Sequence, residues 1–277
     1  MDTQSPGSPI LALDSITHTD SRCIGAVVLA ASHGGAYSGY LAAKARVRAA
    51  IFNDAGVGLD EAGIGGLAYL EQLGIPAAAA LHTSCRIGDG GDLLARGRIG
   101  HANAPARRLG CLPGQTAAAA ASHLAQATGT ADGSPPPADE NRFLVHERPG
   151  GPKIWALDSA SLVQADDAGH VVITGSHGEL MGGNPALAIK AAVLAAIFND
   201  AGVGMDGAGT GRLPVLDARG IAAATVDHRT ARIGDGRSAW ETGRLSHVNR
   251  TAAALGARAG MPVAEFCERV LAACKKD

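Results

Sequence analysis

The chain has 277 residues, of which 46% are hydrophobic and 18% charged, with a formal net charge of −2 at pH 7. This composition is typical of a globular protein with an apolar core, and the absence of a basic surplus argues against a nucleic-acid partner. No apolar run reaches the roughly 18 residues of a membrane-spanning helix, and the first residues lack the pattern of a secretion signal. We therefore expect a cytoplasmic protein with no nucleic-acid and no membrane partner.

The ten residues AAIFNDAGVG occur twice, at 49–58 and at 195–204. Residues 49–110 align without a gap with residues 195–256, and the upstream motifs ALDS and SHG also recur. A repeat of this length is domain-sized, so the sequence predicts a tandem duplication. We expect a first α/β repeat at 1–127, a Pro/Gly-rich linker at 128–150 and a second α/β repeat at 151–277.

Taken in chain order, each repeat predicts alternating strands and helices. Apolar runs predict strands at 24–31, 48–54 and 75–82 in the first repeat, and strands at 170–175 and 194–200 in the second. Ala-rich or periodic segments predict helices at 40–47, 63–74 and 185–194, and one after each RIGDG turn. This alternation predicts an α/β fold of two Rossmann-like halves with mostly parallel sheets, related by a pseudo-twofold axis.

Polar residues that recur in both halves follow the predicted strands, at the edge where open α/β sheets bind ligands. The candidate catalytic residues are His33, Asp54 and His101 in the first half and His177, Asp200 and His247 in the second. The candidate substrate-binding residues are Ser32, Asn53, Arg86, Asp89 and Asn103, together with Ser176, Asn199, Arg232, Asp235 and Asn249.

Each repeated motif has a functional and a structural interpretation. Ser-His-Gly after the first strand suits an anion site at a helix N-terminus, or a tight turn. The Asn-Asp loop offers a metal ligand or general base in Asp54 and Asp200, with glycines that let backbone amides approach a ligand, or else a helix cap. The arginine of RIGDG suits a substrate carboxylate, or a salt bridge to the aspartate of the same motif. His101 and Asn103, like their counterparts, are expected at a helix start, where the asparagine also suits a cap.

The absent motifs narrow the chemistry. GxxxxGK[ST] and a GxGxxG motif after the first strand are missing, so no nucleotide cofactor is predicted. The cysteines form no CxxC pair, and Cys85 aligns with Ala231, which disfavours a cysteine enzyme. We expect a hydrolase or lyase of small-molecule metabolism. It would act on a polar or anionic metabolite by His/Asp acid–base catalysis, cleaving an amide or C–N bond or carrying out lyase or isomerase chemistry.

Four questions remain open at this stage. A divalent metal held by scattered His and Asp ligands would make the protein a metal-dependent hydrolase. The same residues would also serve a non-enzymatic sensor of small anions. The sequence leaves open whether there are two equivalent sites or one composite site, and whether the chain forms a homo-oligomer.

Overall fold

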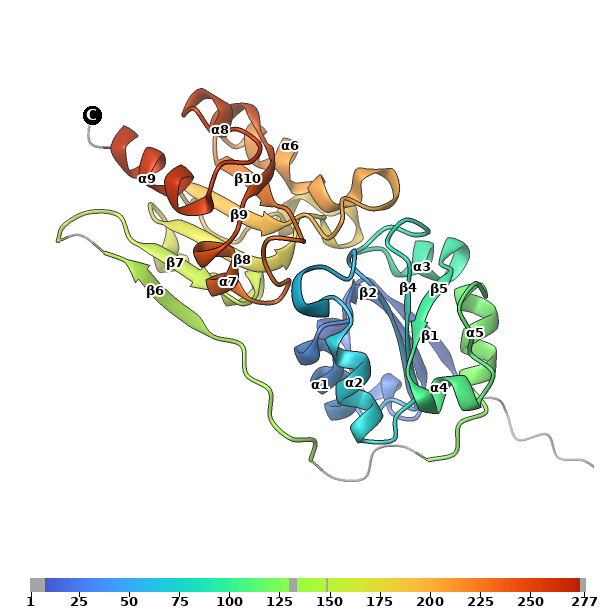
Figure 1. Ribbon diagram of the computed structural model, residues 1–277. Coiled ribbons are helices and arrows are strands. Elements are labelled where there is room, and N and C mark those ends of the chain that lie inside the picture. The colour runs from blue at the N-terminus through green and yellow to red at the C-terminus, as the bar shows by residue number, and fades with distance from the viewer. Residues whose placement is uncertain (1–7, 130–133, 148, 275–277) are drawn as a thin grey trace, which may run out of the picture. The chain divides into compact units, whose positions relative to one another are not determined.

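The computed structural model describes residues 8–129, 134–147 and 149–274. The chain divides into two compact units, and each is described by itself below (Figure 1). Unit 1 holds the described residues up to Gly56, those of Gly63–Ala138, and Gly204–Asp206. Unit 2 holds Val57–Ala62, the described residues of Asp139–Val203, and those from Gly207 onward. The predicted boundaries at 127 and 151 stay a prediction.

Unit 1 contains a sheet whose strands follow the chain order, β1-β2-β3-β4-β5. β1 to β4 pair in parallel, and β5 pairs antiparallel with β4. The strands are β1 (Ile10–Leu13), β2 (Val27–His33), β3 (Ala49–Asn53), β4 (Ala77–Ala80) and β5 (Ile99–Ala102). Because β1 to β4 are parallel, their carboxyl ends lie at one edge of the sheet. The strand order does not reverse, so this sheet has no topological switch point.

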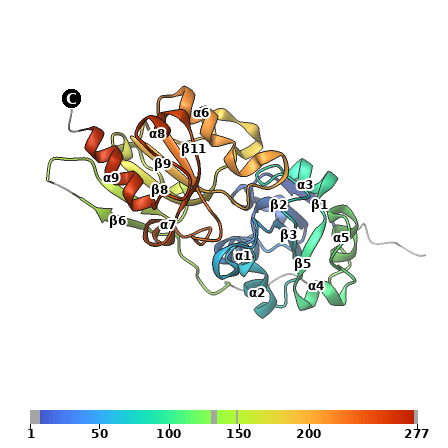
Figure 2. The same cartoon turned by 45° about the horizontal axis from the view of Figure 1, so that its top comes forward.

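Helices cover both faces of this sheet (Figure 2). One core lies under α1 (Ala36–Lys44) and α2 (Gly65–Gln72) and includes Ala42, Phe52 and Leu70. The other lies under the helices that follow β4 and includes Leu93 and Leu124. Those helices are α3 (Gly90–Arg96), α4 (Ala104–Arg108) and α5 (Ala117–Leu124).

Unit 2 repeats this plan with one more strand, in the order β11-β10-β9-β8-β7-β6. β7 to β10 are parallel, and the outer strands β6 and β11 are antiparallel to their neighbours. The strands are β6 (Arg142–His146), β7 (Ile154–Leu157), β8 (Val171–His177), β9 (Ala195–Asn199), β10 (Ala222–Val226) and β11 (Leu245–Val248). β6 lies within 128–150, the range assigned to a linker from sequence.

Helix α6 (Arg212–Ala218) covers one face of the second sheet. The other face packs against α7 (Gly236–Glu241), α8 (Arg250–Ala254) and α9 (Val263–Ala273). Short 3-10 turns complete both units: η1 (Ile16–His18), η2 (Ser21–Cys23), η3 (Leu59–Glu61), η4 (Ala160–Leu162), η5 (Ala165–Asp167), η6 (Met181–Gly183), η7 (Pro185–Leu187) and η8 (Met205–Thr210).

The fold confirms the predicted α/β class with two mostly parallel sheets, and the predicted strands are present as β2, β3, β4, β8 and β9. The predicted helix at 185–194 is wrong, because that segment forms only the 3-10 turn η7. The guanidinium of Arg212 donates to the carbonyl oxygens of Leu187 and Ala188, which an α-helix here would use itself. His101 and His247 lie on strands β5 and β11 rather than at helix starts.

Within the described ranges, no helix is long and apolar enough to cross a membrane.

Candidate functional site

The repeated NDAGVG loop has an unusual backbone in both copies. After Asp54, the φ angles are 49° at Ala55, 74° at Gly56, 62° at Val57 and 73° at Gly58. A β-branched valine in this left-handed region is strained, and such strain gathers at functional sites. The second copy has the same angles within a few degrees, from Ala201 (49°) to Gly204 (69°).

The Asn-Asp pair holds this loop. The Asn53 side-chain oxygen accepts a hydrogen bond from the Ala55 amide at 2.9 Å, and Asp54 Oδ1 accepts one from the Gly56 amide at 3.0 Å. In each of these two hydrogen bonds, a side chain accepts from the backbone amide two residues further along the chain. Together they lower the free-energy cost of the left-handed turn. Asn199 and Asp200 do the same at 2.9 Å and 3.0 Å. Each aspartate, however, makes further hydrogen bonds besides the one that holds the loop.

In unit 1 the buried Asp54 also binds a histidine from the end of the neighbouring strand. Its Oδ1 accepts from the backbone amide and faces the ring Nδ1 of His82, both at 2.8 Å. The side chain of His82 is 23% exposed and that of Asp54 only 2%. A buried carboxylate on Nδ1 fixes that nitrogen as the donor and leaves Nε2 to exchange protons. A second histidine, His101, places Nε2 3.8 Å from Asp54 Oδ2.

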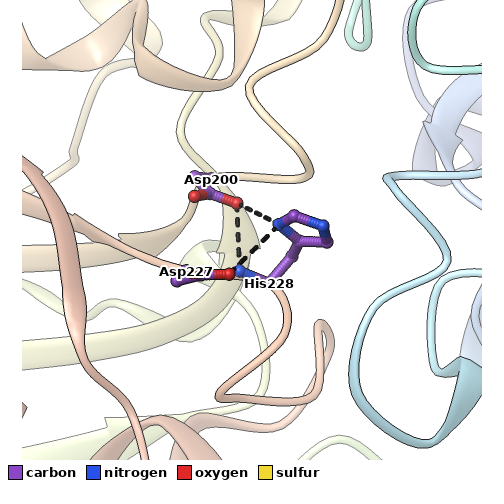
Figure 3. A group of neighbouring side chains, drawn as sticks. All are labelled: Asp200, Asp227 and His228. Atoms are coloured by element: carbon purple, nitrogen blue, oxygen red, sulfur yellow. Dashed lines mark hydrogen bonds and ion pairs between the residues drawn. The ribbon is translucent and has the colours of Figure 1, made fainter.

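Unit 2 contains the same pair with different neighbours. His228 Nδ1 lies 3.0 Å from Asp200 Oδ1 and 3.5 Å from Asp227 Oδ1. Figure 3 shows the ring with its other nitrogen directed away from both carboxylates. The side chain of His228 is 20% exposed, so this ring, like that of His82, is partly accessible to solvent.

Asp200 is held ionised by its surroundings. Burial alone raises its pKa, but hydrogen bonds from the ring and the amide of His228, from the Gly202 amide and from the Ser246 hydroxyl outweigh burial and lower the pKa below its usual value. An ionised Asp200 stabilises a positive charge on the ring when His228 takes up a proton.

The backbone of each histidine is held within its own unit. The Leu59 amide donates to the His228 carbonyl at 2.8 Å in unit 2, and the Met205 amide donates to the His82 carbonyl at 2.8 Å in unit 1. A Cβ on Gly58 would lie 2.9 Å from the His228 carbonyl oxygen, and one on Gly204 would lie 3.0 Å from that of His82. The repeated glycines therefore serve close backbone approach to the histidine of each pair.

The predicted histidines of the Ser-His-Gly motifs lie at the ends of β2 and β8. His33 Nδ1 accepts from the Gly35 amide at 3.2 Å, and His177 Nδ1 accepts from the Glu179 amide at 3.3 Å. Burial lowers the pKa of His33 to about 4, so this ring is neutral at pH 7. His33 and Asn53 are register partners on adjacent strands, which puts His33 at the same sheet edge as Asp54.

Several predicted binding residues support the site from inside the protein. The Ser32 hydroxyl accepts from the Ile16 amide at 3.2 Å, and the Ser176 hydroxyl accepts from the Ala160 amide at 2.9 Å. The buried amide groups of Asn53 and Asn199 donate across to the chain after the next strand, at the carbonyls of Cys85 and Ala231.

The structure separates Asn103 and Asn249 from this edge. Asn103 caps α4 and also accepts from the amide of Ala77, the first residue of β4, at 2.9 Å. Its side-chain amide donates to the Ile75 carbonyl at 2.9 Å, and Asn249 makes the equivalent bonds to Ala223 and Ile221. Both asparagines therefore tie together the amino ends of strands, opposite the edge that carries the Asp–His pairs. His247 is exposed on β11.

The RIGDG turns combine helix caps with ion pairs. Asp89 and Asp235 cap α3 and α7 through their side chains. Arg232 binds Asp235 and Asp60, each at 2.9 Å, while Arg86 lies 3.9 Å from Asp206. In unit 2 this turn borders a cleft of about 440 Å³ lined by Asn141, Phe143, Asp158, Arg232, Gly234, Asp235, Arg237 and Glu241.

The sequence-based selection omitted His82, His228 and Asp227. His82 and His228 recur in a His-x₃-Arg pattern directly after the third strand of each half, so the repeat itself contained the signal. Asp227 does not recur in the first half, where Leu81 occupies the equivalent position, so the repeat gave no signal for it.

One group within the described residues also has the composition of a metal site. One ligand atom from each of Asp200, Asp227 and His228 lies within 4.8 Å of the others. The two carboxylate oxygens nearest the ring already accept hydrogen bonds from backbone amides, from His228 at 3.0 Å and from Arg229 at 2.9 Å.

Comparison of the chain with family models, curated proteins and solved structures gives no match.

Proposed function

We propose that this protein is an enzyme that transfers protons through its Asp–His pairs, acting on a small polar or anionic metabolite. The observation that carries the proposal is the buried carboxylate on Nδ1 of a partly exposed histidine, Asp54 on His82 and Asp200 on His228. Placed after adjacent parallel strands, each pair lies where α/β sheets bind ligands. The histidines take the catalytic role, and the aspartates orient them and stabilise their charge.

The chemistry that fits is hydrolysis of an amide or another C–N bond, with lyase or isomerase chemistry as its close relative. In hydrolysis, Nε2 accepts a proton from water as the water oxygen bonds to the carbonyl carbon. The imidazolium then returns that proton to the leaving nitrogen as the C–N bond breaks. In an elimination or isomerisation the same nitrogen removes a proton from carbon and delivers it to the leaving group or to a neighbouring atom.

An anionic group on the substrate would be held by the RIGDG arginines. Arg232 has a side chain 43% exposed, its orientation is fixed by two aspartates, and it borders the cleft in unit 2. A guanidinium suits a carboxylate, and because Nε, Nη1 and Nη2 of Arg232 already donate to Asp235 and Asp60, the substrate would have to replace one of these aspartates. The helix-end amides expected to help are engaged in part, because the Gly34 amide donates to Asn53 and the Gly35 amide to His33.

We further propose that the two units arose by duplication of one Rossmann-like half. The identical decapeptide, the matching strained loops and the matching Asp–His pairs support this origin. Each unit carries its own pair, which favours two sites over a single one. The cytoplasmic location expected from sequence is part of the same proposal.

A metal-dependent hydrolase is the second candidate, favoured by the group Asp200, Asp227 and His228. A metal there would activate water directly. A metal on Nδ1 would have to replace the ring proton that faces Asp200, and both carboxylate oxygens would share it with backbone amides, which is why the metal-free mechanism ranks first.

The first experiment needs no substrate. ¹⁵N NMR of the histidine rings should show His82 and His228 as Nδ1–H tautomers at neutral pH, assigned with His→Gln variants. Nε2–H tautomers at both residues would contradict the proposal.

A thermal-shift screen against small carboxylates, amides and phosphate esters, with and without chelator, then addresses substrate and metal. A ligand at 100 times its Kd adds about 2.7 kcal/mol of stability. Loss of stability with chelator, restored by a divalent cation, would move the metal site ahead. A ligand that binds and is never converted would support the sensor instead.

A further inference from the structure

All three tyrosines of the chain lie on the two helices that cover one face of the first sheet. Tyr37 and Tyr40 are on α1 and Tyr69 is on α2. The rings of Tyr37 and Tyr40 are 5.7 Å apart, and the Lys44 ammonium lies 5.7 Å from the centre of the Tyr40 ring. Tyr40 also acts electrostatically on Tyr69, whose pKa is raised by burial and by Tyr40. Tyr37 and Tyr40 thus form an aromatic pair on α1, and Tyr69 lies on the neighbouring helix α2; the three side chains are here named the tyrosine surface.

The sequence S-P-P-P-A at 134–138 belongs to unit 1 and reaches this surface. The Tyr69 hydroxyl donates to the Pro136 carbonyl at 2.5 Å. Ser134, Pro135 and Pro136 each precede a proline, which restricts all three to extended conformations. A polyproline segment has no internal hydrogen bonds, so its carbonyls are available to an outside donor.

We propose that the tyrosine surface is a docking site for a polyproline segment and that its occupant is this chain's own 134–138. Aromatic side chains that donate to the carbonyls of a preformed extended segment are a general means of recognising proline-rich chains. The entropy cost is low, since the prolines are already restricted and the segment is tethered to the same chain. Docking holds the segment against α2 independently of the Asp–His chemistry.

The test measures access to the docked segment in the full-length protein. Cleavage before Asp139 by an Asp-specific endoproteinase requires the residues around that bond to leave the surface and enter the protease. Tyr69→Phe removes the donor and keeps the ring, and we expect cleavage at this bond to become several-fold faster. Ser122→Ala, which removes an exposed hydroxyl on α5 outside the tyrosine surface, is the control and should cleave at the wild-type rate.

A decaproline peptide added to the wild-type protein should speed the same cleavage by competing for the surface, and it should have little effect on Tyr69→Phe. Circular dichroism confirms that the variants are folded. Equal cleavage rates in Tyr69→Phe and wild type, or no response of wild type to the peptide, would overturn the proposal.

Discussion

The two units cover equivalent sheet faces in different ways. In unit 1, α1 packs directly on α2, and the contact depends on Gly66, where a Cβ would lie 2.4 Å from the Gly35 carbonyl oxygen and 2.8 Å from that of Gly34. In unit 2 the aligned position is Arg212, which is 4% exposed, and the segment that would match α1 is a 3-10 turn.

Arg212 replaces a helix contact by a set of hydrogen bonds. Its Nε donates to the Glu179 carbonyl at 2.9 Å, its Nη1 donates to the Leu187 carbonyl at 3.0 Å, and its guanidinium lies 4.8 Å from the centre of the Phe198 ring. The cover thus differs between the units, helix in one and loop in the other, while the strained loop and the Asp–His pair are alike. We infer that the requirement common to both units lies at the sheet edge and not in the packing of the cover.

The largest effect is expected when the charge of one Asp–His pair is removed at a time. In Asp54→Asn and Asp200→Asn, the backbone amides that bind Oδ1 keep an oxygen facing Nδ1, so the ring tautomer is retained and only the charge is lost. Since positioned acid–base groups contribute about 10²- to 10⁴-fold, we expect losses in kcat of that order, with ligand binding kept. Asp20→Asn, at an exposed ion pair with Arg22, is the control. Equal activity in all three variants would remove the pairs from the mechanism.

The next largest effect is expected at Arg212. Arg212→Met keeps an apolar stem but leaves the buried Glu179 without the guanidinium and the Leu187 carbonyl without its donor. Each buried carbonyl left without its donor costs about 1–3 kcal/mol, so loss of the bonds to Glu179 and Leu187 should lower the free energy of unfolding by about 2–6 kcal/mol in urea denaturation. Adding Glu179→Gln should recover part of the loss. A loss below about 1 kcal/mol would mean that the loop cover does not depend on Arg212.

The free energy of unfolding should depend on pH through His33. Its pKa is lowered from 6.5 to about 4 in the folded state, so the unfolded chain binds the proton first as pH falls. The stability contribution is complete above about pH 6.5 and is lost progressively down to about pH 4, by up to about 3 kcal/mol. His33→Asn should flatten the stability curve over this window, whereas His18→Asn, at an exposed position, should not. An unchanged slope in His33→Asn would show that the ring titrates alike in both states.

The sequence predicted the strands and most of the covering helices, and its failures have physical reasons. β2, β3 and β4 are buried apolar runs, so local pattern suffices, and His33 and Asn53 are register partners at the ends of β2 and β3. The helix at 185–194 failed because Arg212, far along the chain, takes up the carbonyls of Leu187 and Ala188. β6 has only three apolar residues in a row, is exposed or half-buried and follows a proline-rich stretch, so its apolar signal was too short to separate it from the predicted linker. Pairing of Asp54 with His82 is a tertiary contact that the repeat indicated only indirectly.

The smallest predicted effect tests the helix contact of unit 1 with two adjacent glycines. A Cβ at Gly66 meets the backbone of Gly34 and Gly35, whereas one at Gly65 meets only the Ala36 amide nitrogen at 3.7 Å, an ordinary contact. Overpacking costs about 1–3 kcal/mol, so Gly66→Ala should lower the free energy of unfolding by that amount. Gly65→Ala should be neutral or stabilise by up to about 1 kcal/mol, because alanine restricts the unfolded chain. If both variants unfold alike, the close approach of α1 to α2 is not what Gly66 provides. In that case nothing in unit 1 would require a glycine at position 66. The difference between Gly66 and Arg212 would then come only from the need of the unit 2 loop for an arginine.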